Sequence, residues 1–392
     1  MISDPRKFDV IVLGGGAAGL MCAAVAGQRG RRVTLLEHNG QVGRKILISG
    51  GGRCNFTNLH CGPNNFFSEN KHFAKSALAL YQPRHFIELV ERYGIAWHEK
   101  TLGQLFCDQS ARAIVEMLLA ECERGGVEVV LNARGIAVEG AGGGGFRVAC
   151  SQGEFSAETL VVATGGLSIP TLGATELGYE LARQFGLRVI APRPALVPLT
   201  LGGAEAGWTE LAGVAATVEA SAGGAKFREK MLVTHRGLSG PAVLQASSYW
   251  RPGETLVLDF APDANILGPL LKPAARRDET ALRQVLRTVL PQRLANHLAE
   301  AGAPQGWTNA ALEDCERGLH RWALHPVGTE GFAKAEVTAG GVDTCDLQAR
   351  TMEARAVPGL FFIGEAVDVT GQLGGFNFQW AWASGVAAGR AV

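Results

Sequence analysis

The sequence has little that would indicate a metal-binding, disulfide-rich or nucleic-acid-binding protein. Lys and Arg together number 37, as do Asp and Glu, so the formal net charge is zero. Since proteins that bind nucleic acid usually carry excess positive charge, this balance predicts no nucleic-acid partner. The eight cysteines include no Cys-x-x-Cys pair, which favours reduced thiols. The nine histidines show no metal-ligand spacing, so no metal site is predicted.

The sequence also lacks a cleavable leader and a convincing membrane span. The N-terminal residues MISDPRKFDV place no apolar segment ahead of a cleavage signal. Residues 10–27 carry no charge, but five glycines and a change of period favour a strand, a turn and a buried helix. We therefore expect a cytoplasmic protein with no membrane partner, and the sequence leaves its oligomeric state open.

What the sequence has in excess is glycine, with 52 residues that occur in clusters. Clustered glycine indicates backbone packed closely against a ligand. The first cluster, GGGAAG, lies between a strand-like run at 8–14 and a helix-like run at 20–30, and a second strand-like run follows at 31–37. Strand, turn, helix and strand within about thirty residues predict a βαβ unit with parallel strands.

This unit carries a dinucleotide-binding fingerprint. Gly14 permits the tight turn, Gly16 lets the backbone approach a pyrophosphate, and Gly19 lets helix and strand pack closely. The phosphates are expected at the helix N-terminus, where free N–H groups favour an anion. Glu37 ends the next strand and is placed to accept hydrogen bonds from a ribose. The same segments add three further binding candidates: Ala17, Ala18 and His38, the last of which has a surface position as its alternative.

Two distant segments favour FAD over NAD as the dinucleotide. A strand-like run ends in ATGG at 163–166, as in flavoproteins whose third major strand ends beside the cofactor. Near the C-terminus, the run at 357–368 resembles the flavoprotein segment whose acid approaches the ribityl chain, with Glu365 or Asp368 as that acid. A final helix opens after two glycines, and its N–H groups are expected to stabilise negative charge on the reduced flavin. The binding candidates are Ala163, Thr164, Gly165, Gly364, Glu365, Asp368, Gly374, Gly375, Phe376 and Asn377.

The texture of the sequence changes near residue 190, where three prolines within 191–201 indicate a domain crossing. We predict an α/β fold in which residues 1–190 and 335–392 form a Rossmann-like FAD-binding domain of the two-dinucleotide-binding-domain flavoprotein type. Short alternating strands predict an inserted β-barrel from 191–262 and 324–334. A run rich in Leu, Arg and Ala predicts a small helical domain over 263–323.

Four segments carry a family resemblance: GGGAAG, GRKILISGGGRCNFTN, ATGGLSIPTLGATELGYELA and GEAVDVTGQLGGFNFQWAWASG. They resemble a bacterial family of mostly uncharacterised FAD-dependent oxidoreductases, variously labelled aminoacetone-oxidase-like or dehydro-bile-acid-reductase-like. The resemblance spans nearly the whole chain and implies the same arrangement of domains. The sequence departs from the family pattern at 174–179, where a Gly-Asp-Gly turn is usual. Neither Glu176 nor Leu177 is an aspartate, so any role that the family gives to an aspartate in this turn is not carried over to them.

The resemblance places the segment around SGGGRCN along the cofactor. Cationic side chains and glycine N–H groups suit a pyrophosphate and a flavin edge. For the cationic pair Arg44 and Lys45, two solvated surface charges are the alternative. Cys54 lacks a second cysteine five positions later, so we expect a lone thiol packed near the flavin in place of a redox pair. The candidates from this segment are Arg44, Lys45, Ser49, Gly51, Gly52, Arg53, Cys54 and Asn55.

These features predict an FAD-dependent oxidoreductase that transfers a hydride between the flavin and a small organic substrate or NAD(P)H. No second Gly-x-Gly-x-x-Gly follows a strand, so NAD(P)H is expected only as a transient reductant. The sequence identifies no catalytic acid or base. For His235, a position over the flavin and a structural turn are both open. A tRNA-modifying flavoprotein and a non-catalytic, FAD-binding redox sensor are the alternative functions.

Overall fold

The computed structural model describes residues 5–140 and 144–392, and these divide into two compact units. The first unit comprises residues 1–193 and 337–392, and the second comprises residues 194–336. Residues 1–4, which are part of the N-terminal segment considered for a leader, and residues 141–143 lie outside the described residues. The second unit holds both predicted insertions, and their separation into a barrel and a helical domain stays a prediction.

The first unit is built on a mixed sheet whose strand order is β7-β2-β1-β10-β9-β8, with β20 paired to the end of β10. Val10 of β1 lies opposite Val33 of β2 in a parallel register, which confirms the predicted βαβ unit. β7, β2, β1, β10 and β20 run parallel, whereas β8 and β9 are antiparallel additions. The bounds are β1 Arg6–Leu13, β2 Val33–Leu36, β7 Glu128–Val130, β8 Ala137–Gly140, β9 Phe146–Cys150, β10 Gly153–Val162 and β20 Leu360–Phe362.

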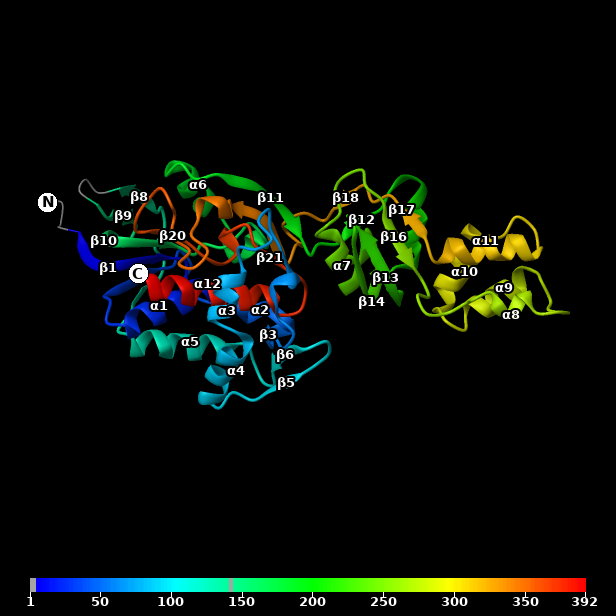
Figure 1. Ribbon diagram of the computed structural model, residues 1–392, viewed down its shortest axis with the longest axis horizontal. Coiled ribbons are helices and arrows are strands. Elements are labelled where there is room, and N and C mark those ends of the chain that lie inside the picture. Colours follow the sequence, from blue (N-terminus) through cyan, green and yellow to red (C-terminus); the bar gives the residue numbers. More distant parts are fainter. Residues whose placement is uncertain (1–4, 141–143) are drawn as a thin grey trace. The chain divides into compact units, whose positions relative to one another are not determined.

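Two helices from opposite ends of the chain, α1 and α12, pack along each other in the first unit (Figure 1). Their close approach depends on glycine, because a Cβ at Gly385 or Gly389 would lie 2.7 Å from a carbonyl oxygen of α1. A helical pattern in the sequence predicts one helix over about 70–93, but two helices form there, because Pro83 forces an extended residue before it. The helices are α1 Ala17–Gln28, α2 Arg44–Ile48, α3 Lys75–Leu80, α4 Pro83–Arg92, α5 Arg112–Arg124, α6 Leu177–Gln184 and α12 Phe376–Ala391.

Three small sheets complete the first unit and its connection to the second. They pair β3 with β6 and β5, β4 with β21, and β11 with β19. Their bounds are β3 Asn55–Asn58, β4 Phe66–Phe67, β5 Trp97–Glu99, β6 Gln104–Cys107, β11 Val189–Ala195, β19 Val337–Val342 and β21 Thr370–Gly371. The pairing of β11 with β19 brings the two chain crossings between the units together.

The second unit has a seven-stranded antiparallel sheet, in the order β17-β16-β13-β14-β15-β12-β18, and five helices. One apolar core joins the inner face of the sheet to the helices. Of the helices that the structure describes in either unit, none is long and apolar enough to cross a membrane. The bounds are β12 Leu199–Thr200, β13 Ala215–Ala222, β14 Ala225–Val233, β15 Gly237–Ser239, α7 Pro241–Ser247, β16 Leu256–Asp259, α8 Gly268–Leu271, α9 Glu279–Leu286, α10 Gln292–Ala301, α11 Asn309–Leu319, β17 Trp322–Leu324 and β18 Gly328–Thr329.

A histidine between two carboxylates joins the helices of the second unit to its sheet. His320 lies 2.8 Å from Asp259, at the end of β16, and 3.1 Å from Glu316 on α11. Glu316 also accepts hydrogen bonds from two backbone N–H groups, those of Ile266 and Leu267. Burial disfavours the charged ring, but the hydrogen bonds to the two carboxylates outweigh it and raise the pKa of His320.

The substitution His320→Gln is therefore expected to reduce stability in a pH-dependent way. Because the folded-state pKa lies above the ordinary value of about 6.5, the charged histidine stabilises the fold fully below that pH. The contribution is lost as the pH rises through the raised pKa. Denaturant unfolding at several pH values should show the largest difference from wild type at about pH 6 and a decreasing difference as the pH rises through the raised pKa. A difference that grows with pH would contradict the assignment.

Candidate functional site

Four of the segments singled out in the sequence meet at the carboxyl edge of the parallel strands. Leu13 lies opposite Leu36 of β2 and Val162 of β10, and Val162 lies opposite Phe362 of β20. The residues that follow these strand ends are therefore neighbours: Gly14, Glu37, Ala163 and, after Ile363, Gly364. This edge is where ligands bind in open parallel sheets.

The three fingerprint glycines differ in the space around them. A Cβ at Gly14, where φ is +107°, would lie 2.5 Å from the Ala163 carbonyl oxygen, and one at Gly19 would lie 1.9 Å from that of Gly14. Both positions are closed by the protein's own backbone. A Cβ at Gly16 would meet no atom within 4 Å. An open glycine at the N-terminus of α1, next to Ala17 and the buried Ala18, fits the approach of a pyrophosphate.

Glu37 is buried, with a relative exposure of 6%, and it organises the turns beside the fingerprint. Its Oε2 accepts a 2.8 Å hydrogen bond from the Gly15 N–H, and its Oε1 accepts two from Asn39. Each carboxylate oxygen accepts two hydrogen bonds, so Oε2 retains capacity for a ribose hydroxyl. His38 lies 3.3 Å from Glu37 through Nδ1, while its buried Nε2 has no partner in the part of the chain described.

The two cations that follow are held by the protein, unlike the solvated surface pair considered as the alternative. Arg44 donates to the Asn39 side chain at 2.7 Å and to two carbonyl oxygens, those of Thr171 and Leu172. The Lys45 ammonium lies 2.6 Å from Glu365 Oε2. Lys45 therefore connects α2 to the strand end at β20, whereas Arg44 connects it to the loop after β10.

The other oxygen of Glu365 accepts a 2.8 Å hydrogen bond from the backbone N–H of Thr338, which is 1% exposed. Glu365→Ala would leave that buried donor unpaired, at a cost of about 1–3 kcal/mol in the free energy of unfolding. Glu365→Gln keeps an acceptor and should cost less. Denaturant unfolding of the apoprotein measures both. Equal stability of the alanine variant and the wild type would show that this hydrogen bond does not matter.

The SGGGRCN segment forms a tight loop in which three successive glycines, 50–52, have left-handed φ angles. A Cβ at Gly51 would meet no atom within 4 Å, and one at Gly52 would lie 4.0 Å from its nearest neighbour, so this face of the loop is open. The Ser49 hydroxyl donates to the Ile46 carbonyl oxygen. The side chain of Arg53 is exposed. This combination of open backbone and an exposed cation is compatible with an anionic ligand.

Cys54 is fully buried behind this loop with φ of +50°, and Asn55 begins β3. Burial raises the pKa of the Cys54 thiol well above its ordinary value, so the reactive thiolate is not populated at neutral pH. Iodoacetamide should therefore label the exposed Cys345 of the folded protein and leave Cys54 unmodified, as read by peptide mass spectrometry. Unfolded protein, in which both are labelled, is the control. Equal labelling rates in the folded protein would contradict a buried thiol.

The loop after β10 contributes an open glycine and a buried hydroxyl. Gly165 has φ of +77° and space around its Cα, while the Thr164 hydroxyl is buried without a hydrogen-bond partner in the described residues. A Cβ at Gly178 would lie 2.4 Å from that hydroxyl. Glu176, in the segment that departs from the family pattern, is exposed immediately before α6.

Two predicted binding side chains are used within the protein itself. Asp368 is 4% exposed and accepts hydrogen bonds from the Glu69 N–H and the Ser68 hydroxyl, and its burial raises its pKa. Asn377 donates to the Gly371 carbonyl oxygen and accepts from the Gly371 N–H, closing the turn before α12. Any contact of these two residues with a cofactor would therefore be additional to these bonds.

The N-terminus of α12 is held tightly against β3. Gly374 and Gly375 have φ of +120° and +93°, and a Cβ at Gly375 would lie 2.4 Å from the Thr57 carbonyl oxygen. With its amide oxygen turned inward, Asn55 accepts the Gly375 N–H at 3.2 Å. The next residue, Phe376, is 7% exposed and packs edge-on against an aromatic ring of β4.

The sequence reasoning missed two residues that hold this site together. Thr338 accepts backbone N–H groups from residues 167 and 168 and donates its own N–H to Glu365. Gln379 is fully buried, accepts from the Thr57 hydroxyl at 2.6 Å and donates to the Tyr81 carbonyl oxygen at 2.7 Å. A lone glutamine in the apolar run FNFQWAWASG was the one available signal, because buried amides need partners.

Comparison with known proteins places this architecture in a family. The family model of the HI0933-like protein Rossmann domain matches residues 8–391. The chain belongs to this family. It is also similar to a quinol-fumarate reductase structure, with a TM-score of 0.51 and 15% identity over 99% of this chain and 71% of that one. At that identity the likeness concerns the fold.

Three named relatives match almost the whole chain. A ribosomal RNA dihydrouridine synthase of Escherichia coli is 49% identical over 98% of both chains. A protein of the same name from Haemophilus influenzae is 44% identical over 97% of this chain and 98% of its own. The 3-dehydro-bile acid delta(4,6)-reductase of Clostridium scindens is 30% identical over 97% of this chain and 98% of its own.

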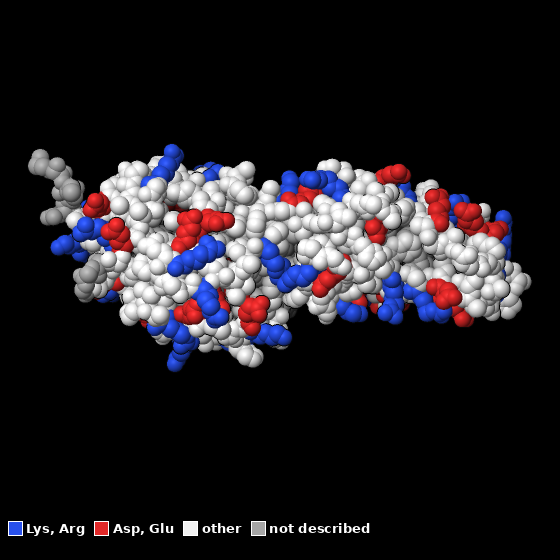
Figure 2. Space-filling model, turned by 90° about the horizontal axis from the view of Figure 1, so that it is seen from above, with Lys and Arg blue, Asp and Glu red and all other residues white. Residues whose placement is uncertain are grey.

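These relatives correct one prediction and refine another. The expectation of no nucleic-acid partner is wrong, since two close relatives bear names that specify RNA as substrate. The family resemblance is confirmed in part: the HI0933-like family model matches and a dehydro-bile-acid reductase is among the relatives, whereas two other relatives are named ribosomal RNA dihydrouridine synthase. The physical reason for the error is that net charge sums over the whole chain, whereas RNA contacts depend on local side chains. Figure 2 shows basic and acidic side chains interspersed on one face, so a formal net charge of zero does not mean that basic side chains are absent from the surface.

Proposed function

We propose that this chain is an FAD-dependent enzyme that reduces a uridine of ribosomal RNA to dihydrouridine. The observation that carries the proposal is the 49% identity to the Escherichia coli enzyme across 98% of both chains. Of the functions predicted from the sequence, the alternative of a tRNA-modifying flavoprotein is therefore better supported than a small-molecule oxidoreductase. A small-molecule enone reductase is the second candidate, since the Clostridium scindens relative is named for one at 30% identity.

Both candidates share one reaction type. Uracil has a C5–C6 double bond conjugated to the C4 carbonyl, so a hydride adds at C6, β to the carbonyl, and a proton adds at C5. A Δ4 double bond in a 3-keto steroid is conjugated to its carbonyl in the same way. Reduced FAD supplies such a hydride, and a nicotinamide of the NAD(P)H class is the two-electron donor that we propose restores the reduced cofactor.

The residues of the carboxyl edge fit this cofactor. We propose that Gly16 and the α1 N-terminus bind its pyrophosphate and that Glu37 binds its adenosine ribose. The open glycines at 51, 52 and 165 leave room for the backbone of the protein to approach it closely. Gly374, Gly375 and the first N–H groups of α12 would lie at the pyrimidine edge, where their dipole favours negative charge.

The test is a reconstituted reaction on ribosomal RNA from an Escherichia coli strain that lacks the 49% identical relative. The purified chain, FAD and NADPH or NADH are added, and the RNA is digested to nucleosides for mass spectrometry. We expect dihydrouridine to appear with wild type and not with Gly16→Val. If no dihydrouridine forms but a 3-keto-Δ4 steroid is reduced, the small-molecule candidate replaces this one.

A further inference from the structure

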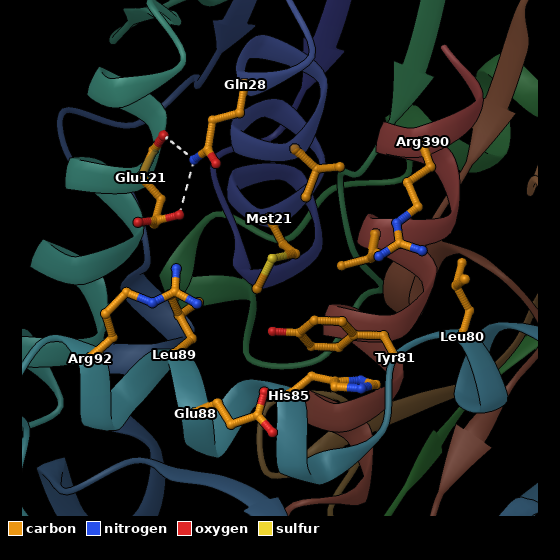
Figure 3. A pocket seen from close by; sticks show the side chains of 12 residues that line it. Met21, Gln28, Leu80, Tyr81, His85, Glu88, Leu89, Arg92, Glu121 and Arg390 are labelled. Atoms are coloured by element: carbon orange, nitrogen blue, oxygen red, sulfur yellow. Dashed lines mark hydrogen bonds between the residues drawn. The ribbon is translucent and has the colours of Figure 1, made fainter.

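The first unit contains a pocket of about 560 Å³ away from the carboxyl edge, formed by side chains of α1, α4, α5 and α12 and by the end of α3 (Figure 3). Its volume lies in the range of small-molecule sites. None of its lining residues belongs to the set placed at the carboxyl edge. The lining comprises Met21, Val25, Gln28, Leu80, Tyr81, His85, Glu88, Leu89, Arg92, Glu121, Val386 and Arg390.

Two arginines give this pocket its positive side. Neither Arg92 nor Arg390 forms a hydrogen bond or ion pair with another described residue, and both are exposed at helix ends. Figure 3 shows both guanidinium groups directed to the pocket, from α4 and from α12. Burial raises the pKa of Tyr81, with Glu121 and Glu88 adding to the rise and Arg92 and Arg390 opposing it.

The acidic side chains of the pocket are not equivalent. Glu121 accepts hydrogen bonds from Gln28 at 2.9 Å and Tyr93 at 2.6 Å and pairs with Arg124, so its charge is compensated. Glu88 is exposed and remains an acceptor for N–H groups of a ligand. The pocket therefore has excess positive charge. Its two guanidinium groups face only one uncompensated carboxylate, that of Glu88.

Tyr81 supplies a flat apolar surface. Its ring lies 5.5 Å from that of His85 on one side, and Figure 3 shows the pocket interior on the other. The backbone of Tyr81 is anchored, since its carbonyl oxygen accepts the hydrogen bond from the buried Gln379. An anchored aromatic ring is the platform on which nucleobases stack.

We propose that this pocket binds a nucleoside phosphate, with the base against Tyr81 and the phosphate at one of the two guanidinium groups, that of Arg92 or that of Arg390. Guanidinium groups are the preferred phosphate ligands, and Glu88 would accept an N–H group of the base. This inference rests on the proposed function: the nucleoside phosphate would be an unpaired nucleotide of the substrate RNA, held away from the reacting uridine. A free nucleotide has the same chemistry, and the experiment separates the two sources.

The experiment measures binding of 5′-UMP, uridine, inorganic phosphate and a labelled single-stranded uridine decamer to the full-length chain with FAD. The test variants are Arg92→Ala/Arg390→Ala and Tyr81→Leu, and the control is Arg84→Ala, which removes an exposed arginine from the same α4. We expect 5′-UMP and the decamer to bind about tenfold or more weakly to the double variant. Uridine and phosphate should each bind wild type more weakly than 5′-UMP.

The outcomes separate this inference from the proposed function. Equal binding of 5′-UMP to the wild type, the double variant and Arg84→Ala, or no binding at all, overturns the pocket. If 5′-UMP binds but the decamer does not compete, the nucleoside phosphate site stands and its RNA source is overturned. Thermal unfolding excludes a folding defect, and Tyr81→Phe, which keeps the ring, should retain binding. Dihydrouridine formation is scored separately, so a catalytic failure leaves a positive binding result intact.

Discussion

The substitution Gly16→Val is expected to abolish FAD binding while the apoprotein stays folded. A Cβ at this position meets no atom within 4 Å, and φ of −83° suits any L-residue. The free energy of unfolding should therefore change by less than about 1 kcal/mol. The added side chain would instead occupy the space through which the pyrophosphate reaches the N–H groups of α1. Bound flavin is measured by absorption after gel filtration, and apoprotein stability by denaturant unfolding.

Gly318→Ala in α11 is the matched control, because a Cβ there also meets no atom within 4 Å. Gly318 lies in the second unit, within a helix where alanine is favoured over glycine. This control should bind FAD as wild type does. Full flavin occupancy in Gly16→Val would contradict a pyrophosphate at α1, whereas an unfolded Gly16→Val apoprotein would contradict the open space at this position.

The different roles of the fingerprint glycines could be predicted from the sequence because their spacing fixes local geometry. Strand β1, a tight turn and helix α1 follow one another within residues 6–28, so turn, approach and packing roles follow from short-range sterics. The structure agrees in placing backbone atoms against Gly14 and Gly19 and open space beside Gly16. The meeting of the ATGG and Ile-Gly-Glu segments was also predictable, since parallel strands end at one edge.

The partners of individual side chains could not be predicted, because they come from distant parts of the chain. Asp368 bonds residues 300 positions away, and Lys45 pairs with a glutamate 320 positions away. An acid that follows Ile-Gly has the same local sequence whether it faces a ribityl chain or a buried loop. The helix break at Pro83, by contrast, follows from local sterics, although the helical pattern over 70–93 predicts a single helix. Tyr81 of the pocket lies just before this break.

The substitution Gly375→Ala is expected to destabilise the first unit and to remove the proposed flavin site together with it. The residue has φ of +93°, a conformation that costs an L-residue about 1–2 kcal/mol. Its new Cβ would also lie 2.4 Å from the Thr57 carbonyl oxygen, a backbone atom of β3 that cannot rotate away. Relieving this clash moves the start of α12 or of β3, at a further cost of about 1–3 kcal/mol.

The measurement is denaturant unfolding of apo and FAD-loaded protein, and the control is Gly207→Ala, where a Cβ meets no atom within 4 Å and φ is not left-handed. Gly375→Ala should lose several kcal/mol of unfolding free energy and most of its bound FAD, while Gly207→Ala keeps both. The shift of α12 matters for the cofactor because its first N–H groups are the donors proposed at the pyrimidine edge. Wild-type stability with normal FAD binding would show that β3 shifts easily to accommodate the added Cβ. The close contact between Gly375 and β3 would then not be needed to position the site.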